Sequence, residues 1–345
     1  MKASNGRDWS DKISDLDGYF DVVVRPMLQQ GHEGELCGWL KEMSLIKTSC
    51  VCTSEQCEGR NLVWSPARVV DKYNWACLHC SKKQTIRDNS FFLSIKCEFK
   101  TCLQIILAWC KMFPSDIAAS CLDVKEHVVK KVYERCAKIA DDYVNSHLEE
   151  FKLGGPDSVL IVDEYPGGYM TENVPEISVS RKRNNNSHTI LCIAEANALP
   201  PRMWLHMIRA VPATANKTQG NIIRCGMVEE ALKEIVRHVL PGSVLVANHR
   251  SRCCSYESIK ELKQFAVISV EYLKNFDVPG KNKLVNNLET IWQTAVDVCE
   301  EVQESTNSLG RQIISTHLWR QRFNTLAPNA FECMLNQIAE AYKFT

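Results

Sequence analysis

The sequence predicts an α/β domain in its carboxyl-terminal half, preceded by helical and cysteine-bearing segments. Short buried strands at "VLIVDEY", "HTILCIAEA", "SVLVAN" and "QFAVISVEY" alternate with longer segments of helical periodicity. The clearest of these helical segments are "NIIRCGMVEEALKEIVRHVLPG" and "NKLVNNLETIWQTAVDVCEEVQES". We therefore place an α/β domain over residues 155–310.

The rest of the chain divides by composition. Residues 1–48 are expected to be a helical N-terminal segment, because "FDVVVRPMLQQ" and "LCGWLKEMSLI" carry apolar residues at helical spacing. Residues 49–92 bear cysteines and lack long periodic runs, and residues 93–152 are helical again. Residues 311–345 are expected to form C-terminal helices.

Bulk composition limits the function classes. The 345 residues contain 41 basic and 41 acidic side chains, so any nucleic-acid binding must rest on local patches. The first residues carry no secretory signal, and the longest apolar run, "LQIILAWC", is too short to span a bilayer. The 17 cysteines are therefore expected to be reduced, in the cytosol or nucleus and away from membranes.

Two cysteine knuckles predict a structural zinc ion. "CVCTSEQC" supplies Cys52 and Cys57, and "CLHC" supplies Cys77 and Cys80 twenty residues after Cys57. Four thiolates at such spacing, separated by a strand-like stretch, are typical of a zinc ribbon. The first knuckle is irregular, and Cys50 is an alternative ligand. The competing interpretation is a small thiol-lined core without metal.

A local excess of positive charge follows the knuckles. Residues 61–100 carry seven Lys or Arg against three acids. Lys82, Lys83 and Arg87 are the expected phosphate contacts, although a solvated face would show the same composition.

The stretch "PSDIAASCLDVKEHVVKKVYERCAKI" has the form of a helix-turn-helix, with the turn near Leu122 and Asp123. On the second helix, Lys131, Arg135 and Lys138 would form an outer stripe that could face a DNA groove. A plain helical hairpin with a solvated face remains the alternative.

The order of these parts resembles transposases of the Merlin type and their bacterial insertion-sequence relatives, over about residues 50–340. Five stretches in order carry the resemblance: "WACLHCSKKQTIRDNSFF", "VLIVDEYPGG", "LPGSVLVANHRSRCCSYESI", "VEYLKNFDVPGKNKLVNNLETIW", and "HLWRQRFN" with "AFECMLNQIAEAY". The resemblance implies a zinc ribbon and a helix-turn-helix-like DNA-binding segment before a ribonuclease H-like domain.

The family's three catalytic carboxylates fall on Asp163, Asn248 and Glu289. They would hold two divalent ions roughly 4 Å apart, which stabilise the attacking and leaving oxygens. Asn248 offers a neutral carbonyl oxygen in place of a bridging carboxylate, so Mg²⁺ or Mn²⁺ binding is expected to be weak or absent. Glu164 cannot replace it, because consecutive strand residues point to opposite faces.

Other polar positions of the family site have also changed. Tyr272 stands where the family has a histidine in the following strand, and Leu284 and Val285 stand where it has a His-Thr pair. We therefore expect a remnant catalytic triad that no longer works.

These observations predict a catalytically inactive, domesticated transposase-derived protein of the nucleus. It would bind DNA or chromatin, together with nuclear protein partners, in transcriptional regulation or silencing. A homo-oligomeric state is left open. One alternative is an active DNA transposase whose site is completed by a different carboxylate. Another is a protein-interaction adaptor without DNA binding, which the neutral net charge favours.

Overall fold

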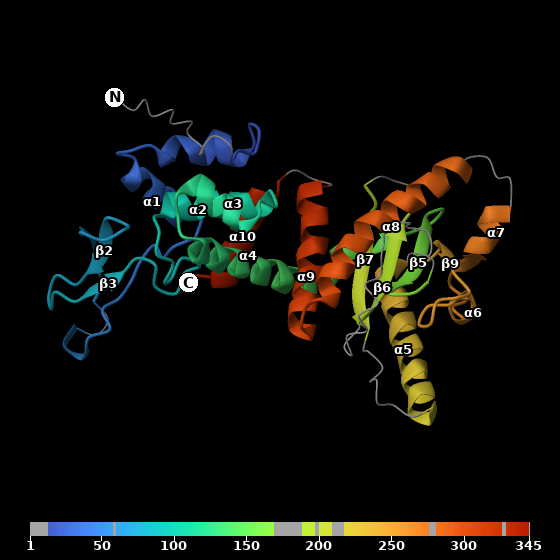
Figure 1. Cartoon of the computed structure of the whole chain (residues 1–345). Coiled ribbons are helices and arrows are strands. Elements are labelled where there is room, and N and C mark those ends of the chain that lie inside the picture. The colour runs from blue at the N-terminus through green and yellow to red at the C-terminus, as the bar shows by residue number, and fades with distance from the viewer. Residues whose placement is uncertain are drawn as a thin grey trace. The chain divides into compact units, whose positions relative to one another are not determined.

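The structure, a computed structural model, describes residues 13–57, 60–168, 188–196, 200–208, 217–275, 281–325 and 329–344 (Figure 1). The chain divides into two compact units. Unit 1 comprises Met1–Tyr143 and Phe323–Thr345, and unit 2 comprises Val144–Arg322. The mixed α/β class that the sequence predicts is confirmed.

Unit 1 is built around a buried helix. Its helices are η2 (Phe20–Val24), η3 (Arg25–Leu28), α1 (Glu33–Glu42), η4 (Glu55–Cys57), α2 (Phe99–Cys110), α3 (Ser115–Leu122), α4 (Glu126–Ser146) and α10 (Ala330–Tyr342). The apolar run "LQIILAWC" forms most of α2 and is almost entirely buried. The ring of Phe92 meets that of Phe99 edge-to-face at 5.1 Å, and Phe20 and Phe331 meet in the same way. Such pairs add to the free energy that burial contributes to the core.

A small antiparallel sheet forms the cysteine-bearing part of unit 1. Its strands are β1 (Val63–Pro66), β2 (Tyr73–Ala76) and β3 (Lys83–Thr85), in that order. Trp64 pairs with Trp75 across β1 and β2, and their rings meet edge-to-face at 5.6 Å. The strand-like stretch that the sequence predicts between the knuckles is therefore two short strands.

The predicted helical pair of unit 1 is present. Helix α3 ends at Leu122, and Asp123 takes a left-handed conformation with φ 50° that reverses the chain into α4. Val128 and Val132 of α4 are buried, as their spacing predicts. The C-cap conformation thus places the turn at the predicted position.

Unit 2 contains a five-stranded mixed sheet in the order β10-β9-β5-β6-β7. The strands β5, β6 and β7 are antiparallel, whereas β9 and β10 run parallel to β5. Their bounds are β5 (Val159–Tyr165), β6 (Thr189–Glu195), β7 (Met203–Ile208), β9 (Val244–Ala247) and β10 (Ala266–Ser269). A two-stranded parallel pair, β4 (Leu153–Gly154) with β8 (Val239–Leu240), lies outside this sheet.

Helices cover both faces of the sheet in unit 2 (Figure 1). On one face, Trp204 of β7 stacks on His238 of α5 with ring centroids 3.7 Å apart. On the other face, the thiols of Cys192 in β6 and Cys299 in α8 are hydrogen-bonded to each other. The helices of unit 2 and its C-terminal edge are η5 (Leu148–Phe151), α5 (Lys217–His238), α6 (Tyr256–Ile259), α7 (Val270–Asn275), α8 (Lys281–Gln303), α9 (Asn307–Arg320) and η6 (Gln321–Thr325).

Three details differ from the sequence-based expectations. Strand β7 was not anticipated. The stretch "QFAVISVEY" is a strand only as far as Ser269, and α7 begins at Val270. The predicted strand position of Tyr272 is therefore wrong, since this residue is half exposed on a helix. The helical segment "NIIRCGMVEEALKEIVRHVLPG" is helical only as far as His238, because the next two residues pair with β4.

Candidate functional site

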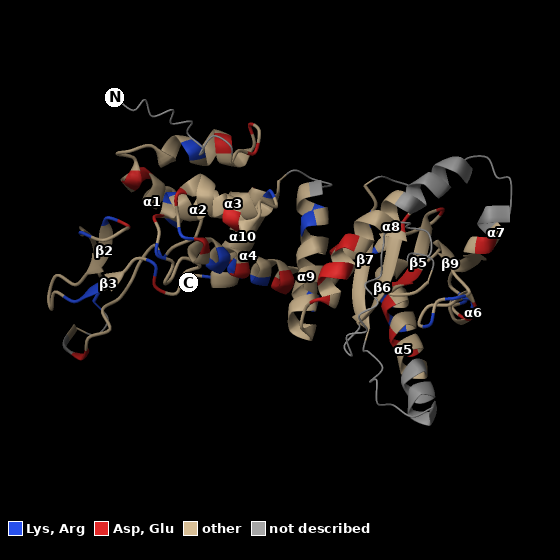
Figure 2. Ribbon diagram, viewed as in Figure 1, with Lys and Arg blue, Asp and Glu red and all other residues tan. Residues whose placement is uncertain are grey.

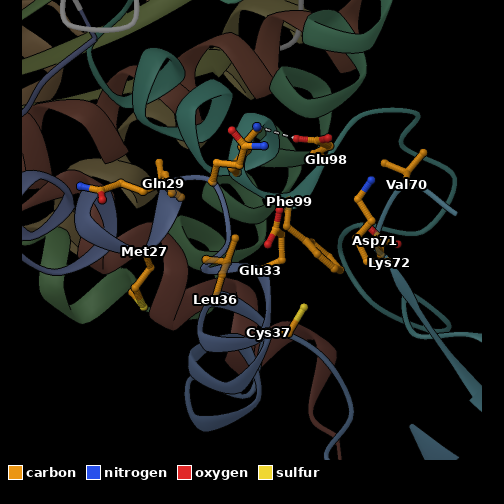
Figure 3. Close-up of a pocket in the computed structure, with 13 residues that line it drawn as sticks. Met27, Gln29, Glu33, Leu36, Cys37, Val70, Asp71, Lys72, Glu98 and Phe99 are labelled. Atoms are coloured by element: carbon orange, nitrogen blue, oxygen red, sulfur yellow. Dashed lines mark ion pairs between the residues drawn. The ribbon is translucent and has the colours of Figure 1, made fainter. Parts of the chain in front are cut away.

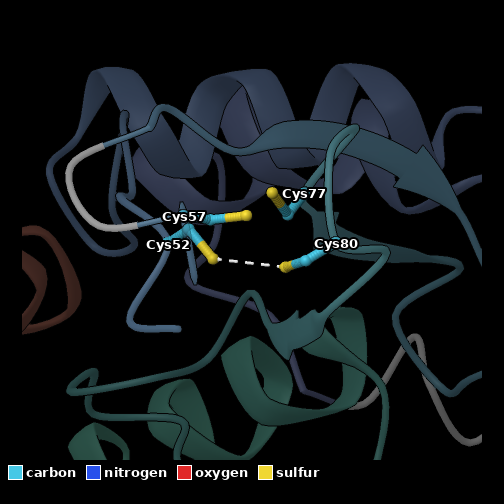
Figure 4. Close-up of side chains that lie close together, drawn as sticks. All are labelled: Cys52, Cys57, Cys77 and Cys80. Carbon is cyan, nitrogen blue, oxygen red and sulfur yellow. Dashed lines mark hydrogen bonds between the residues drawn. The ribbon is translucent and has the colours of Figure 1, made fainter. Parts of the chain in front are cut away.

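Four cysteine thiols of unit 1 converge between the two knuckles (Figure 4). The sulfur atoms of Cys52, Cys57, Cys77 and Cys80 all lie within 4.8 Å of one another. The sulfurs of Cys52 and Cys80 are 3.6 Å apart. Tetrahedral coordination with metal–sulfur bonds of about 2.3 Å separates ligands by roughly 3.8 Å, so this group could hold a metal ion.

Backbone geometry positions the second knuckle. The amide of Cys77 donates to the carbonyl of Lys82 at 2.9 Å, and Ser81 donates back to Cys77 at 3.0 Å. Ser81 adopts φ 58°, which lets the chain turn tightly between β2 and β3. The amides of Cys80 and His79 donate to the Cys77 sulfur and lower the pKa of this thiol to about 6. Cys77 is therefore prepared to act as a thiolate ligand.

The first knuckle is held by the chain that follows it. The amide of Cys52 donates to the carbonyl of Arg60 at 2.8 Å, and that of Cys57 donates to Ser54 at 2.8 Å. Burial raises the pKa of the Cys57 thiol to about 12, and its sulfur lies 3.0 Å from Nδ1 of the exposed His79.

Cys50, the alternative ligand, is not in the group of four. Its sulfur instead lies 3.4 Å from Oε1 of Gln84. The irregular spacing between Cys52 and Cys57 is thus accommodated by the short helix η4 rather than by substitution of Cys50.

Asp163 and Asn248 lie just beyond the point where the pairing of two adjacent parallel strands ends. Val162 pairs with Ala247 in the β5–β9 register, so the next residues, Asp163 and Asn248, lie side by side on the same face. Asp163 lies opposite Cys192 in the pairing of β5 with β6. The free thiol of Cys192 is hydrogen-bonded to that of Cys299 in α8. The Asp163–Asn248 pair therefore lies on the face of the sheet that α8 covers.

Both side chains are enclosed. Asp163 and Asn248 are each 1% exposed. The hydroxyl of Ser251 donates to Oδ1 of Asp163 at 3.0 Å, and the amide of Arg250 donates to Oδ1 of Asn248 at 2.8 Å. Gly168, at φ 65°, approaches the Asp163 carboxylate so closely that a Cβ there would collide with it. Ser251 and Gly168, both in loops, therefore shield the Asp163 carboxylate from solvent.

Position 289 belongs to α8, three residues before the buried Trp292. The side chain of Glu289 lies outside the described part of the chain, as do those of Leu284 and Val285. The predicted approach of Glu289 to Asp163 stays a prediction.

Glu164 has different neighbours from Asp163. Its Oε1 accepts from Nε of Arg252 at 3.0 Å, and its Oε2 accepts from the amide of Cys253 at 2.8 Å. Glu164 is fully buried, as are Cys253 and Cys254. These contacts were missed at the sequence level, although two consecutive cysteines just beyond a strand's carboxyl end were a visible signal.

Arg87 is a structural arginine, so its prediction as a phosphate contact is wrong. The side chain is buried and forms an ion pair with Asp71, in which Nε donates to Oδ2 at 2.7 Å. Nη2 also donates to Oδ1 of Asp71, and the other donors bind the carbonyls of Phe92, Ile95 and Cys97. A guanidinium whose donors are all engaged in this way is not available to a phosphate.

Two of the three basic residues predicted on α4 also have internal partners. Nζ of Lys131 donates to the carbonyl of Ser94 at 2.9 Å, and Nη1 of Arg135 donates to that of Phe91. Lys138 is exposed, as are Lys82 and Lys83 near and within β3. Figure 2 shows basic positions in blue on α4 and at β3. Nζ of Lys82 also lies 2.9 Å from Thr53 Oγ1. The accessible predicted contacts are therefore Lys82, Lys83 and Lys138.

A shallow pocket lies elsewhere in unit 1, between α1, the start of α2 and the loop around Asp71 (Figure 3). Its charges are largely paired already, since Asp71 binds Arg87 and Glu98 lies 2.8 Å from Nζ of Lys100. The two remaining charged residues of the lining, Glu33 and Lys72, have opposite charges and do not define a ligand.

Comparison with known families, curated proteins and solved structures yields no match to this chain. No helix within the described ranges is long and apolar enough to cross a membrane.

Proposed function

We propose that this chain is a transposase-derived, catalytically inactive protein that binds DNA or chromatin in the nucleus. The observation that carries the proposal is that Asp163 and Asn248 directly follow Val162 and Ala247, the last paired residues of two adjacent parallel strands. A catalytic carboxylate pair would occupy these two positions, and one of them is an amide.

The sheet supports a ribonuclease H-like interpretation of unit 2. Its first long strand, β5, lies centrally, with the antiparallel β6 and β7 on one side and the parallel β9 and β10 on the other. Helix α8, which contains position 289, covers the face that bears Asp163. A first strand, a central strand end and a later helix are the elements from which such a site draws its ligands.

The same geometry argues against an active transposase. Two divalent ions need charged, accessible oxygens, and each step of strand cleavage needs an entering water or hydroxyl. Asp163 is covered by Ser251 and Gly168, and Asn248 supplies no charge. Mg²⁺ or Mn²⁺ would bind weakly at most.

Zinc is the metal that the four cysteines of unit 1 fit best. A closed set of four thiolates is typical of structural zinc, whereas Mg²⁺ and Ca²⁺ prefer oxygen ligands. The ion would be held by Cys52, Cys57, Cys77 and Cys80 and would so fix β1–β3, with Lys83 in β3 and Lys82 just before it. These exposed lysines, with Lys138, are the proposed phosphate contacts.

DNA affinity measured as a function of salt tests this proposal. Fluorescence anisotropy of a labelled duplex is followed with the full chain between about 50 and 200 mM salt. The variant Lys82→Glu/Lys83→Glu should bind all DNA sequences more weakly. The slope of log K against log salt concentration should be smaller in magnitude by about 2, since each lost phosphate contact contributes about 0.9. Lys233→Glu/Arg237→Glu, an equal change of charge on α5, is the matched control.

Equal loss of affinity in both variants would contradict the assignment to the ribbon. Absence of salt-dependent binding by the native chain would contradict DNA binding itself.

A protein-interaction adaptor without DNA binding is the second candidate. The specific observation in its favour is that Arg87, Lys131 and Arg135 all bind internal groups. Only half of the six predicted basic contacts remain available, in a chain whose net charge is zero. A role in transcriptional regulation or silencing, with nuclear protein partners, would suit either candidate.

A further inference from the structure

A second group of metal-binding side chains lies in unit 2, separate from the ribbon. The ligand atoms of Glu164, Cys253 and Cys254 all lie within 4.8 Å of one another. Each of the three residues is 0% exposed. Glu164 comes from β5, and the two cysteines come from the loop that joins β9 to α6.

The loop is anchored at several points, which fixes where the two thiols lie. The amide of Tyr256 donates to the carbonyl of Asn248 at 3.1 Å and closes the loop. The Ser251 hydroxyl donates a hydrogen bond to Asp163. The Arg252 guanidinium donates to Glu164 and to the carbonyl of Pro166. A loop held in this way presents its thiols without a large entropic cost of ordering.

The Glu164 carboxylate still has capacity for a metal. The Cys253 thiol also hydrogen-bonds Glu164, but a metal would displace its proton. Each carboxylate oxygen would then accept one hydrogen bond, from Arg252 or from the amide of Cys253. A carboxylate oxygen has two lone pairs, so one on each oxygen is left.

The charges of an occupied site would balance. Among the ligands and Arg252, two thiolates and one carboxylate carry three negative charges, and a divalent ion with the guanidinium carries three positive charges. The nearby Asp163 carboxylate adds a further negative charge, which also favours a divalent ion. Neutrality matters here because an uncompensated charge in a buried site is costly. A divalent ion therefore suits the site better than a monovalent one.

We infer that Glu164, Cys253 and Cys254 bind a second thiophilic divalent metal ion, for which Zn²⁺ is the natural probe. Zinc–sulfur bonds of about 2.3 Å would require the ligand atoms to approach one another by no more than roughly 1 Å. No fourth His, Cys, Asp or Glu joins the group within the residues that the structure describes. Three protein ligands would leave one coordination position for a small exogenous ligand. Sulfur ligands disfavour Mg²⁺, so this site would not supply the Mg²⁺ that strand transfer needs.

Zinc stoichiometry of the full chain tests the inference. After loading with Zn²⁺ and dialysis, elemental analysis should give about two zinc ions per native chain, one for each ligand set. Cys253→Ser and Cys254→Ser should each reduce this to about one, whereas Cys77→Ser should remove the ribbon ion and leave the other. Cys299→Ser, which changes another buried thiol of unit 2, should keep both.

Glu164→Gln covers the case in which a cysteine variant fails to fold. It keeps the side-chain size and an acceptor for Arg252, and it should weaken the second site by at least about tenfold. A native chain with one zinc that is lost with Cys77→Ser would overturn the inference. Two zinc ions retained in a folded Glu164→Gln, Cys253→Ser or Cys254→Ser variant at native affinity would overturn it as well.

Discussion

Replacement of Arg87 by methionine should destabilise unit 1 without directly removing a DNA contact. The guanidinium is buried between Asp71 and three backbone carbonyls, and its Cζ lies 4.5 Å from the ring centroid of Phe99. Methionine keeps much of the volume but none of the donors. Its introduction would leave Asp71, whose side chain is 8% exposed, as a buried charge without its partner.

The expected cost follows from these contacts. Removing one partner of a buried ion pair costs about 3 to 5 kcal/mol, because the remaining charge loses its compensation. The carbonyls of Phe92, Ile95 and Cys97 would also lose a donor. If the free energy of local unfolding of this segment falls by about 3 kcal/mol, the population of its locally unfolded state rises by roughly a hundredfold.

Hydrogen exchange followed by mass spectrometry measures this effect within one unit. Peptides that cover residues 86–98 should exchange faster in Arg87→Met, while peptides from β5 and β6 should exchange as in the native chain. Asp71→Asn combined with Arg87→Met should recover part of the protection, because it removes the uncompensated charge. Lys83→Met, a change of the exposed neighbour, is the control.

Unchanged protection of residues 86–98 in Arg87→Met would refute this reasoning. So would a variant that keeps native stability but loses DNA affinity, since Arg87 would then be a phosphate contact after all.

Two further predictions concern metal and pH. Cys77→Ser should lose the ribbon zinc and the exchange protection of β1–β3, as elemental analysis and hydrogen exchange would show; a folded ribbon without metal would contradict it. Burial and the nearby Arg320 lower the pKa of His317 from 6.5 to about 4. Between these pH values the unfolded state binds more protons than the folded state. The free energy of unfolding should therefore fall as pH falls through this range, by roughly 3 kcal/mol in all. A urea titration at pH 7 and pH 5 checks this, and His317→Gln should show a smaller difference than the native chain.

Periodicity in the sequence predicted much of the α/β unit. Continuous apolar runs such as "VLIVDEY" are buried on both faces and could be assigned as strands, and β5, β6 and β9 lie where such runs occur. Strand β7 has a similar run, "MWLHMI", but its methionines and histidine do not favour strands in particular. In "QFAVISVEY" the apolar pattern continues past Ser269, and sequence alone does not show where pairing with β9 ends.

Spacing predicted the group of four cysteines, because two knuckles define a local cluster regardless of the remaining fold. The basic residues were harder to interpret. Arg87, Lys131 and Arg135 have the composition of a DNA-binding surface, but their partners are carbonyls and a carboxylate supplied by other segments. Glu164, Cys253 and Cys254 meet for the same kind of reason, since the loop after β9 folds over the end of β5.

The central claim is that Asp163 and Asn248 are the remnant of a two-metal catalytic site. Asn248→Asp tests it most directly, because it places a second carboxylate beside the buried Asp163. Without divalent ions this variant should melt at a lower temperature than the native chain, since two buried like charges repel.

Melting temperatures of both proteins with and without Mn²⁺ make the decisive measurement. Mn²⁺ should raise the melting temperature of Asn248→Asp, because the restored carboxylate pair binds the ion, and should leave the native chain and Asn248→Ala nearly unchanged. No response of Asn248→Asp to Mn²⁺ would contradict the claim of a remnant metal site. DNA strand transfer by the native chain, abolished in Asp163→Ala, would instead contradict the claim that the site is inactive.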